Sequence, residues 1–249
     1  MVITGVKKLL FFFSALIFLV YPLHSRAERP HVTEDLGTTE PGKFELEIGT
    51  QFENLGGSEE KAVINEYALI TGIYNRVELN VIVPFQLHNS ENDHEGLGDM
   101  HFLLKSRFLD EGDYTPAIGA LFEVFVPSGD EEKDLGSGHT DYVAKVLFEK
   151  NIGKLMLDIN GGYSFIKEGV DKFFYAASAH YALFDRFHIV SELVGEADHK
   201  AKNEDPLFIM GGFQAHFTCE TFMDIGMRFG LTKDSPDYTL AIGITIPLN

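Results

Sequence analysis

Charged side chains recur at every second position in several stretches of this sequence, where they share one face with small or polar residues. Asp224 and Arg228, for example, flank Gly226 at this spacing. A period of two places such side chains on one face of a β-strand. If that face surrounds a polar interior, its charges attract or repel passing solutes. The residues predicted to line such an interior are Glu45, Glu47, Glu53, Glu78, Asp99, His101, Lys105, Arg107, Glu123, Asp141, Lys145, Asp158, Glu192, Asp224 and Arg228.

Acids outnumber bases in this set, which allows two interpretations. An open interior of this composition would favour cations or neutral polar solutes over anions. The alternative is a set of paired charges that fills and stiffens the interior. Two large aromatic residues, Phe174 and Phe208, fall on the same inward face and are the candidate constriction.

A catalytic interpretation of the inward face is disfavoured. Ser178 and His180 share a face of one predicted strand, and Asp158 and Asn160 share the inward face of the preceding one. Residues two apart on a strand are separated by about 7 Å, too far for a serine–histidine hydrogen bond. We therefore predict no catalytic residues and no enzymatic activity.

Metal and cofactor sites are not predicted either. The stretches 88–95 and 130–134 are rich in ligand atoms, but neither has the spacing of a calcium-binding loop. We interpret them as solvated external loops that share divalent cations with lipopolysaccharide.

The elements that must position these side chains are β-strands. Residues 121–150 show the pattern: two alternating runs flank a connection rich in Gly, Ser and Asp, as in a β-hairpin. Each run is close to the length that a tilted strand needs to cross a bilayer. About twelve such segments are predicted, at 43–54, 61–73, 77–87, 97–108, 114–127, 139–150, 153–166, 171–183, 187–199, 205–217, 221–232 and 237–248.

The opposite face of these strands is apolar and without charge over long runs, for example from Val77 to Leu87 and from Met223 to Leu231. A charge facing lipid near the bilayer centre costs about 2–4 kcal/mol. Tight links alternate with longer polar ones, as periplasmic turns alternate with external loops in outer-membrane barrels. The sequence therefore predicts an all-β, antiparallel transmembrane β-barrel with apolar side chains toward lipid.

The start of the chain predicts export. Lys7 and Lys8 precede an apolar run over 9–20, and Ser25-Arg26-Ala27 supplies small residues for cleavage. The run is shorter than the roughly 20 residues of a membrane-spanning helix. We predict a cleaved signal peptide over 1–27, a periplasmic lead-in over 28–42 and the barrel over 43–249.

Composition narrows the function further. Without residues 1–27 the chain has 17 basic and 38 acidic side chains, a net charge of −21, which disfavours nucleic-acid binding. Cys219 is the only cysteine, so an intrachain disulfide is excluded.

Four blocks of the sequence resemble a known family, the outer-membrane proteins named after the meta-pathway of phenol degradation. They are TEDLGTTEPGKFELEIG at 33–49, GLGDMHFLLKSRF at 96–108, VPSGDEEKDLGSGHTDY at 126–142 and YALFDRFHIVSELVGE at 181–196. The resemblance implies an outer-membrane barrel that transports small, aromatic or hydrophobic molecules. It carries no catalytic residues with it.

These inferences lead to an expected function and an alternative. We expect a monomeric outer-membrane channel that passes small solutes by passive diffusion through a narrow acidic lumen. Eight strands are filled by side chains and 16–18 leave a water channel, so about twelve leave an open or a plugged lumen as alternatives. The other hypothesis is a structural or surface-interaction barrel without transport. Expected partners are outer-membrane lipid, lipopolysaccharide, the solute and the barrel-assembly machinery.

Overall fold

The computed structural model describes residues 30–54, 61–89, 94–198, 205–218, 221–233 and 235–248. The predicted signal peptide and Cys219 lie outside the described residues, as do the predicted loops 55–60 and 200–204. Within the described part, no helix is long and apolar enough to cross a membrane.

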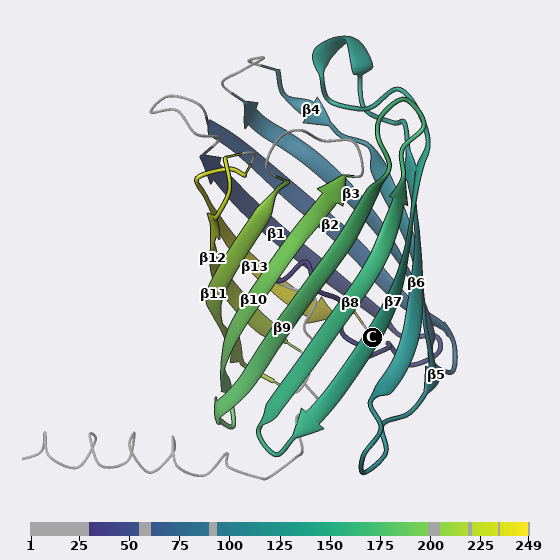
Figure 1. Ribbon diagram of the computed structural model, residues 1–249, viewed down its shortest axis with the longest axis vertical. Helices are drawn as coiled ribbons and strands as arrows, with labels where there is room; N and C mark the ends of the chain where they lie inside the picture. Colours follow the sequence, from purple (N-terminus) through teal and green to yellow (C-terminus); the bar gives the residue numbers. More distant parts are fainter. Residues whose placement is uncertain are drawn as a thin grey trace, which may run out of the picture.

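The described residues form thirteen strands and one short 3-10 helix, η1 (Glu131–Lys133), in an external loop (Figure 1). The strands alternate in burial along their length, as expected for a wall with a wet or filled inside. Their bounds are β1 (Phe44–Asn54), β2 (Lys61–Tyr74), β3 (Val77–Asn89), β4 (Gly96–Leu97), β5 (Met100–Leu109), β6 (Ala117–Val126), β7 (Asp141–Ile152), β8 (Leu155–Phe165), β9 (Lys172–Phe184), β10 (Phe187–Asp198), β11 (Leu207–His216), β12 (Phe222–Gly230) and β13 (Tyr238–Pro247).

Twelve of these strands close into one antiparallel barrel. Neighbours in the chain pair with each other, and β1 pairs with β13 from Glu45–Pro247 to Asn54–Tyr238 to complete the wall. The two-residue β4 pairs only with Phe85 and Gln86 of β3, above the point where β5 joins. The prediction of about twelve antiparallel strands is therefore confirmed.

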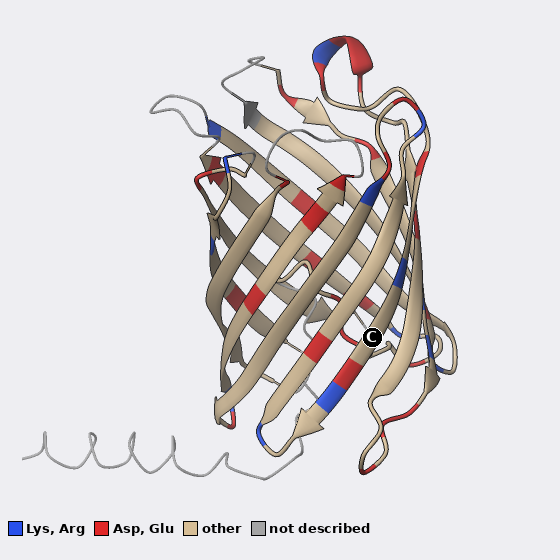
Figure 2. Ribbon diagram, viewed as in Figure 1, with Lys and Arg blue, Asp and Glu red and all other residues tan. Residues whose placement is uncertain are grey.

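The outer surface of the wall is apolar. Large side chains at alternate positions are exposed, among them Leu69, Phe122, Val146, Ile159 and Leu193. Figure 2 shows charged residues on the strands as well as in the loops and turns, so the apolar exterior follows from these exposed side chains and not from an absence of charge in the wall. An exposed apolar band on a closed wall needs lipid around it, because water would penalise so large an apolar area. The barrel lies in the bacterial outer membrane.

The links between strands also follow the predicted asymmetry. Short turns such as those between β2 and β3, β7 and β8, and β9 and β10 lie at one end of the barrel, and longer connections such as residues 127–140 lie at the other (Figure 1). In outer-membrane barrels the short turns face the periplasm. We name the two ends of the lumen periplasmic and extracellular accordingly.

The segment before β1 departs from the prediction. We expected residues 28–42 to form a periplasmic lead-in, but residues 30–42 lie inside the barrel, where His31, Thr33, Asp35, Leu36 and Thr39 are buried. The purple trace of this segment runs within the wall in Figure 1. We call residues 30–42 the plug.

Candidate transport path through the barrel

The plug is held to the wall through its backbone. Glu192 of β10 accepts hydrogen bonds at Oε1 from the N–H groups of Val32 (2.8 Å) and Thr33 (2.5 Å) and from the Thr33 hydroxyl (2.6 Å). Asn160 of β8 accepts from the Glu34 N–H at 2.7 Å and donates to the Glu34 carbonyl at 3.0 Å. These side chains thus supply the bonds that a neighbouring strand would otherwise make.

Two more wall carboxylates continue this pattern toward the periplasmic end. Glu149 of β7 accepts from the Leu36 N–H at 2.9 Å, and Glu78 of β3 accepts from the Thr39 N–H at 2.7 Å. A buried N–H without a partner costs about 1–3 kcal/mol, so each of these bonds removes a penalty. Part of the acid excess of the lumen therefore serves to bind the plug.

Apolar contacts fix the plug at two further points. Leu36 is fully buried in a cluster with Leu103, Ala117, Leu121 and Leu147 of the wall. Gly119 makes this possible, because a Cβ at that position would collide with the Leu36 side chain. Val32 packs against the second cluster, which consists of Phe174, Ala176 and Val194, and Phe208 packs against the same cluster.

A buried ion network lies on the periplasmic side of these contacts. The Lys105 ammonium, only 1% exposed, lies 3.0 Å from Glu78 and 3.4 Å from Asp35. The Asp35 carboxylate also accepts from the Gly37 N–H at 2.9 Å. A charge this deeply buried requires such partners, so Lys105 joins plug and wall.

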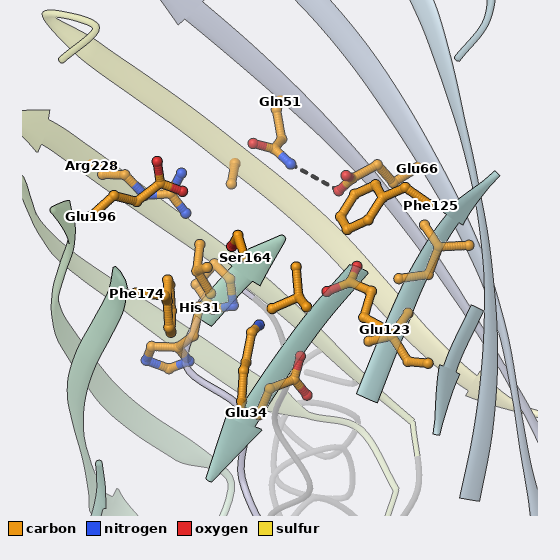
Figure 3. Close-up of a pocket in the computed structure, with 17 residues that line it drawn as sticks. His31, Glu34, Gln51, Glu66, Glu123, Phe125, Ser164, Phe174, Glu196 and Arg228 are labelled. Carbon is orange, nitrogen blue, oxygen red and sulfur yellow. Dashed lines mark hydrogen bonds between the residues drawn. The ribbon is translucent and has the colours of Figure 1, made fainter. Parts of the chain in front are cut away.

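A cavity of about 340 Å³ lies between the plug and the extracellular end. Pro30, His31, Val32 and Glu34 of the plug line it from below. Figure 3 shows Arg228 and Glu196 on one side, with Glu66 and Phe125 across from them. The wall residues are Gln51, Glu66, Ile82, Leu103, Glu123, Phe125, Val143, Lys145, Ser164, Phe174, Glu196, Arg228 and Ala241.

A cavity of only about 20 Å³, bordered by Asp35, Thr39 and Glu45, lies on the periplasmic side of the plug. The plug separates the two.

The acids that line the large cavity mostly have partners of their own. Glu123 lies 3.1 Å from the His101 imidazole, and Glu196 lies 2.7 Å from the Lys172 ammonium. Glu66 accepts a hydrogen bond from the Gln51 amide at 2.8 Å. The upper wall of the cavity is therefore polar, and each of these three carboxylates has a hydrogen-bond or ion-pair partner.

The two bases of the cavity lie over aromatic rings. Lys145 Nζ is 4.8 Å from the centroid of Phe174, and Arg228 Cζ is 5.9 Å from that of Phe208. Among the residues that the structure describes, no carboxylate oxygen lies within 4.0 Å of either cation. Both cations thus lie on ring faces, with Glu34 and Glu53 as more distant electrostatic neighbours of Lys145 and Arg228, respectively.

The residues predicted to line the lumen fall into three groups. One group faces the plug or the space beneath it, a second lies in or beside the large cavity, and a third lies at the ends of the barrel. Arg107 pairs with Asp110 at the periplasmic end, whereas Asp141 pairs with His139 at the other. The first group comprises Glu45, Glu47, Glu78, Lys105, Asp158, Glu192 and Asp224; the second comprises Glu53, His101, Glu123, Lys145 and Arg228; Asp99, Arg107 and Asp141 form the third.

Asp99 organises an external loop and does not lie on the barrel wall. Its carboxylate accepts from the Gly129 N–H (3.0 Å), the Ser137 N–H (2.7 Å) and the Ser137 hydroxyl (2.8 Å). Partial burial alone would raise the pKa of Asp99, but these hydrogen bonds outweigh it and lower the pKa below its ordinary value. The charge fastens residues 128–138 to the loop before β5.

The candidate constriction residues Phe174 and Phe208 belong to one group of apolar contacts, which Val32 of the plug also joins. The plug residues themselves and Glu149 were not predicted as lumen residues. A weak signal existed, because His31, Thr33 and Asp35 alternate as they would in an extended chain with one buried side.

The serine, histidine and acid set is drawn together, but not as a catalytic site requires. The Ser178 hydroxyl donates to Asp158 at 3.0 Å, and His180 Nε2 lies 3.8 Å from the same carboxylate oxygen. The serine proton therefore points to the acid and not to the imidazole, which a nucleophile needs as its base.

Among the described residues, no group of three or more potential ligands is arranged to hold a metal ion.

A closed wall, an apolar exterior and a polar lumen define a bacterial outer-membrane β-barrel. Residues 29–247 match the family described as "Putative MetA-pathway of phenol degradation", and the chain belongs to that family. A comparison with curated proteins finds no match.

Solved structures of similar fold include channels and porins. An outer membrane channel from Pseudomonas putida F1 has a TM-score of 0.69 at 14% identity, over 86% of this chain and 98% of that one. The KdgM porin in complex with disordered oligogalacturonate has a TM-score of 0.60 at 8% identity, over 82% and 99%. The NanC porin has 0.58 at 12%, over 82% and 98%. At these identities the likeness establishes the fold.

Proposed function

We propose that this protein is an outer-membrane channel that passes small solutes, aromatic or hydrophobic compounds among them, by passive diffusion. The observation that carries the proposal is the cavity of about 340 Å³ on the extracellular side of the plug. Its volume lies at the lower end of the range for small-molecule sites, about 300–1,000 Å³. The likeness to channels and porins supports the same function.

The route of the solute runs from the cavity past the plug. The plug lies between the large cavity and the small one, so solutes pass only when it shifts or when they follow its edge. The lumen wall contains more acids than bases and is narrow, and the protein performs no catalysis. We further propose that it is a monomer inserted by the barrel-assembly machinery, with its loops against lipopolysaccharide.

Conductance of the refolded full chain in planar lipid bilayers tests the proposal. We expect discrete conductance steps, and a higher mean conductance for the Glu192→Ala variant, which loses three hydrogen bonds to the plug. The matched control is Glu196→Ala, which removes an acid of the same strand that makes an ion pair with Lys172 instead. The channel would be refuted if neither variant showed conductance or solute flux.

One observation favours a second function, a structural or surface-interaction barrel. Wall side chains bind the plug at Val32, Thr33, Glu34, Leu36 and Thr39, which is an extensive closure. A permanently closed barrel would act through its loops. In that case, cells with the 127–140 loop deleted would show a phenotype, and lumen variants such as Glu123→Ala would show none.

A further inference from the structure

The cavity above the plug has an uneven distribution of unsatisfied charge. Its acids Glu66, Glu123 and Glu196 each have a polar side-chain partner within 3.1 Å. Among the described residues, Lys145 and Arg228 have no carboxylate at ion-pair distance. The Glu34 carboxylate on the cavity floor is the electrostatic neighbour of Lys145, and its Oε2 has no hydrogen-bond partner. The cavity lining therefore holds two cations outside ion pairs against one such carboxylate, although acids are more numerous.

The position of the two cations is built into the wall. Lys145 of β7 pairs in register with Gly162 of β8, which in turn pairs with Phe174 of β9. A Cβ at Gly162 would lie 2.9 Å from Lys145 Cγ, so the glycine lets the lysine side chain lie across β8. The ammonium then reaches the Phe174 ring, where cation–π attraction holds it.

Arg228 is held in a corresponding way from the other side. It lies over Phe208 of β11, which packs against the cluster of Phe174, Ala176 and Val194, as Val32 of the plug also does. The rings under the two cations therefore belong to one group of apolar contacts. Arg228 Nε is buried without a hydrogen-bond partner.

The rest of the lining suits an apolar body. Ile82, Leu103, Phe125, Val143 and Ala241 all contribute to the cavity. The Phe125 ring is fixed against His101, with centroids 4.1 Å apart. Aromatic faces favour stacked or edge-on contact with another ring, and cations without partners favour a carboxylate, which accepts charge-assisted hydrogen bonds.

We propose that this cavity binds small aromatic carboxylates, with the carboxylate on Lys145 or Arg228 and the ring against the apolar lining. The proposal rests on the proposed channel function and names its substrate class. Aromatic cations bind more weakly, because three of the four carboxylates that line the cavity already have partners and the fourth, Glu34, is the electrostatic neighbour of Lys145. Neutral aromatics bind through the lining alone and have an intermediate affinity.

Calorimetric binding to the refolded full chain in detergent tests this with benzoate, benzyl alcohol and benzylamine. We expect benzoate to bind at least about tenfold more tightly than benzylamine, since a charged hydrogen bond contributes roughly 1.5–3 kcal/mol. The double variant Lys145→Gln/Arg228→Gln should weaken benzoate binding about tenfold without changing benzyl alcohol binding, and the two single variants show which cation holds the carboxylate. The control Lys154→Gln alters an exposed turn and should change neither.

Each outcome is decisive. Equal affinity of the wild type for the three probes would overturn the proposal even if a lumen variant failed to fold, as would equal loss of benzoate binding in Lys154→Gln. Bilayer conductance separates this failure from that of the channel. Conductance without benzoate preference refutes the binding site only, whereas benzoate binding without conductance refutes the channel only.

Discussion

Charged side chains are paired differently in the two halves of the lumen. On the periplasmic side the space is filled, and the buried Lys105 contacts both Glu78 of the wall and Asp35 of the plug. On the extracellular side a cavity of about 340 Å³ remains, and Lys145 and Arg228 lie on phenyl rings. Paired charge in filled space holds a structure together, whereas charge without a counter-ion beside a cavity is available to a ligand.

The largest expected effect comes from Lys105→Met. This change leaves Asp35 and Glu78 buried beside each other without their shared cation, which costs about 3–5 kcal/mol of unfolding free energy. Lys145→Met is the matched change on the other side of the plug and should cost less than about 1 kcal/mol, because no ion pair is broken. Urea unfolding in lipid vesicles measures both. Similar losses for the two variants would remove the distinction between the halves.

Leu36→Ala should have the next largest effect. It removes the packing of the plug against Leu103, Ala117, Leu121 and Leu147, which should weaken the binding of the plug to the wall by about 3 kcal/mol. The barrel wall keeps its hydrogen bonds, so the variant should remain folded but show a larger mean conductance. Leu69→Ala, on the exposed lipid side, is the control. An unchanged conductance would show that Leu36 does not retain the plug.

Asp99→Ala tests the extracellular rim. Loss of three hydrogen bonds should loosen residues 128–138 by about 1 kcal/mol, seen as faster hydrogen exchange there. Because the folded-state pKa of Asp99 is lowered, its contribution is fully present above the ordinary value of about 3.9. It is lost as the pH falls through the lower folded-state pKa. This pH dependence would be contradicted if hydrogen exchange of residues 128–138, corrected for the intrinsic exchange rate, did not become faster as the pH falls.

The smallest effect is expected from Arg76→Ala. Its ion pair with Asp110 joins two periplasmic connections, and both side chains are about half exposed. Exposed pairs contribute roughly 0.2–1 kcal/mol, and salt screens them. The unfolding free energy should therefore change by less than about 1 kcal/mol at low salt and by almost nothing at 1 M salt. A larger loss would mean that this end of the barrel also depends on paired charge.

The wall could be predicted from the sequence because each strand repeats the same period-two pattern. The expected segment 187–199 corresponds to β10, Phe187–Asp198, and 77–87 to β3, Val77–Asn89. The expected segment 97–108 was too long at its start, because Gly98 separates the short β4 from β5. There the Gly98 N–H bonds to the carbonyl of Pro84 outside the regular ladder.

The plug could not be predicted in the same way. Its backbone is satisfied by side chains such as Glu192 and Asn160, more than 120 positions away in the sequence. Such contacts leave only the short alternation of His31, Thr33 and Asp35 in the sequence of the plug itself. For the same reason, the strand pattern could place Glu78 and Glu192 on the inner face without showing that they accept hydrogen bonds from the plug.

The anchoring of the plug also implies an order of folding events. Its partners Glu78, Glu149, Asn160 and Glu192 come from β3, β7, β8 and β10, so they surround one space only after most of the sheet has curled round. Residues 30–42 precede every strand in the chain, so the first part of the barrel domain to be synthesised has partners that come together only in the closed wall. Until then, the three carboxylates and the Asn160 amide have no plug backbone to bind.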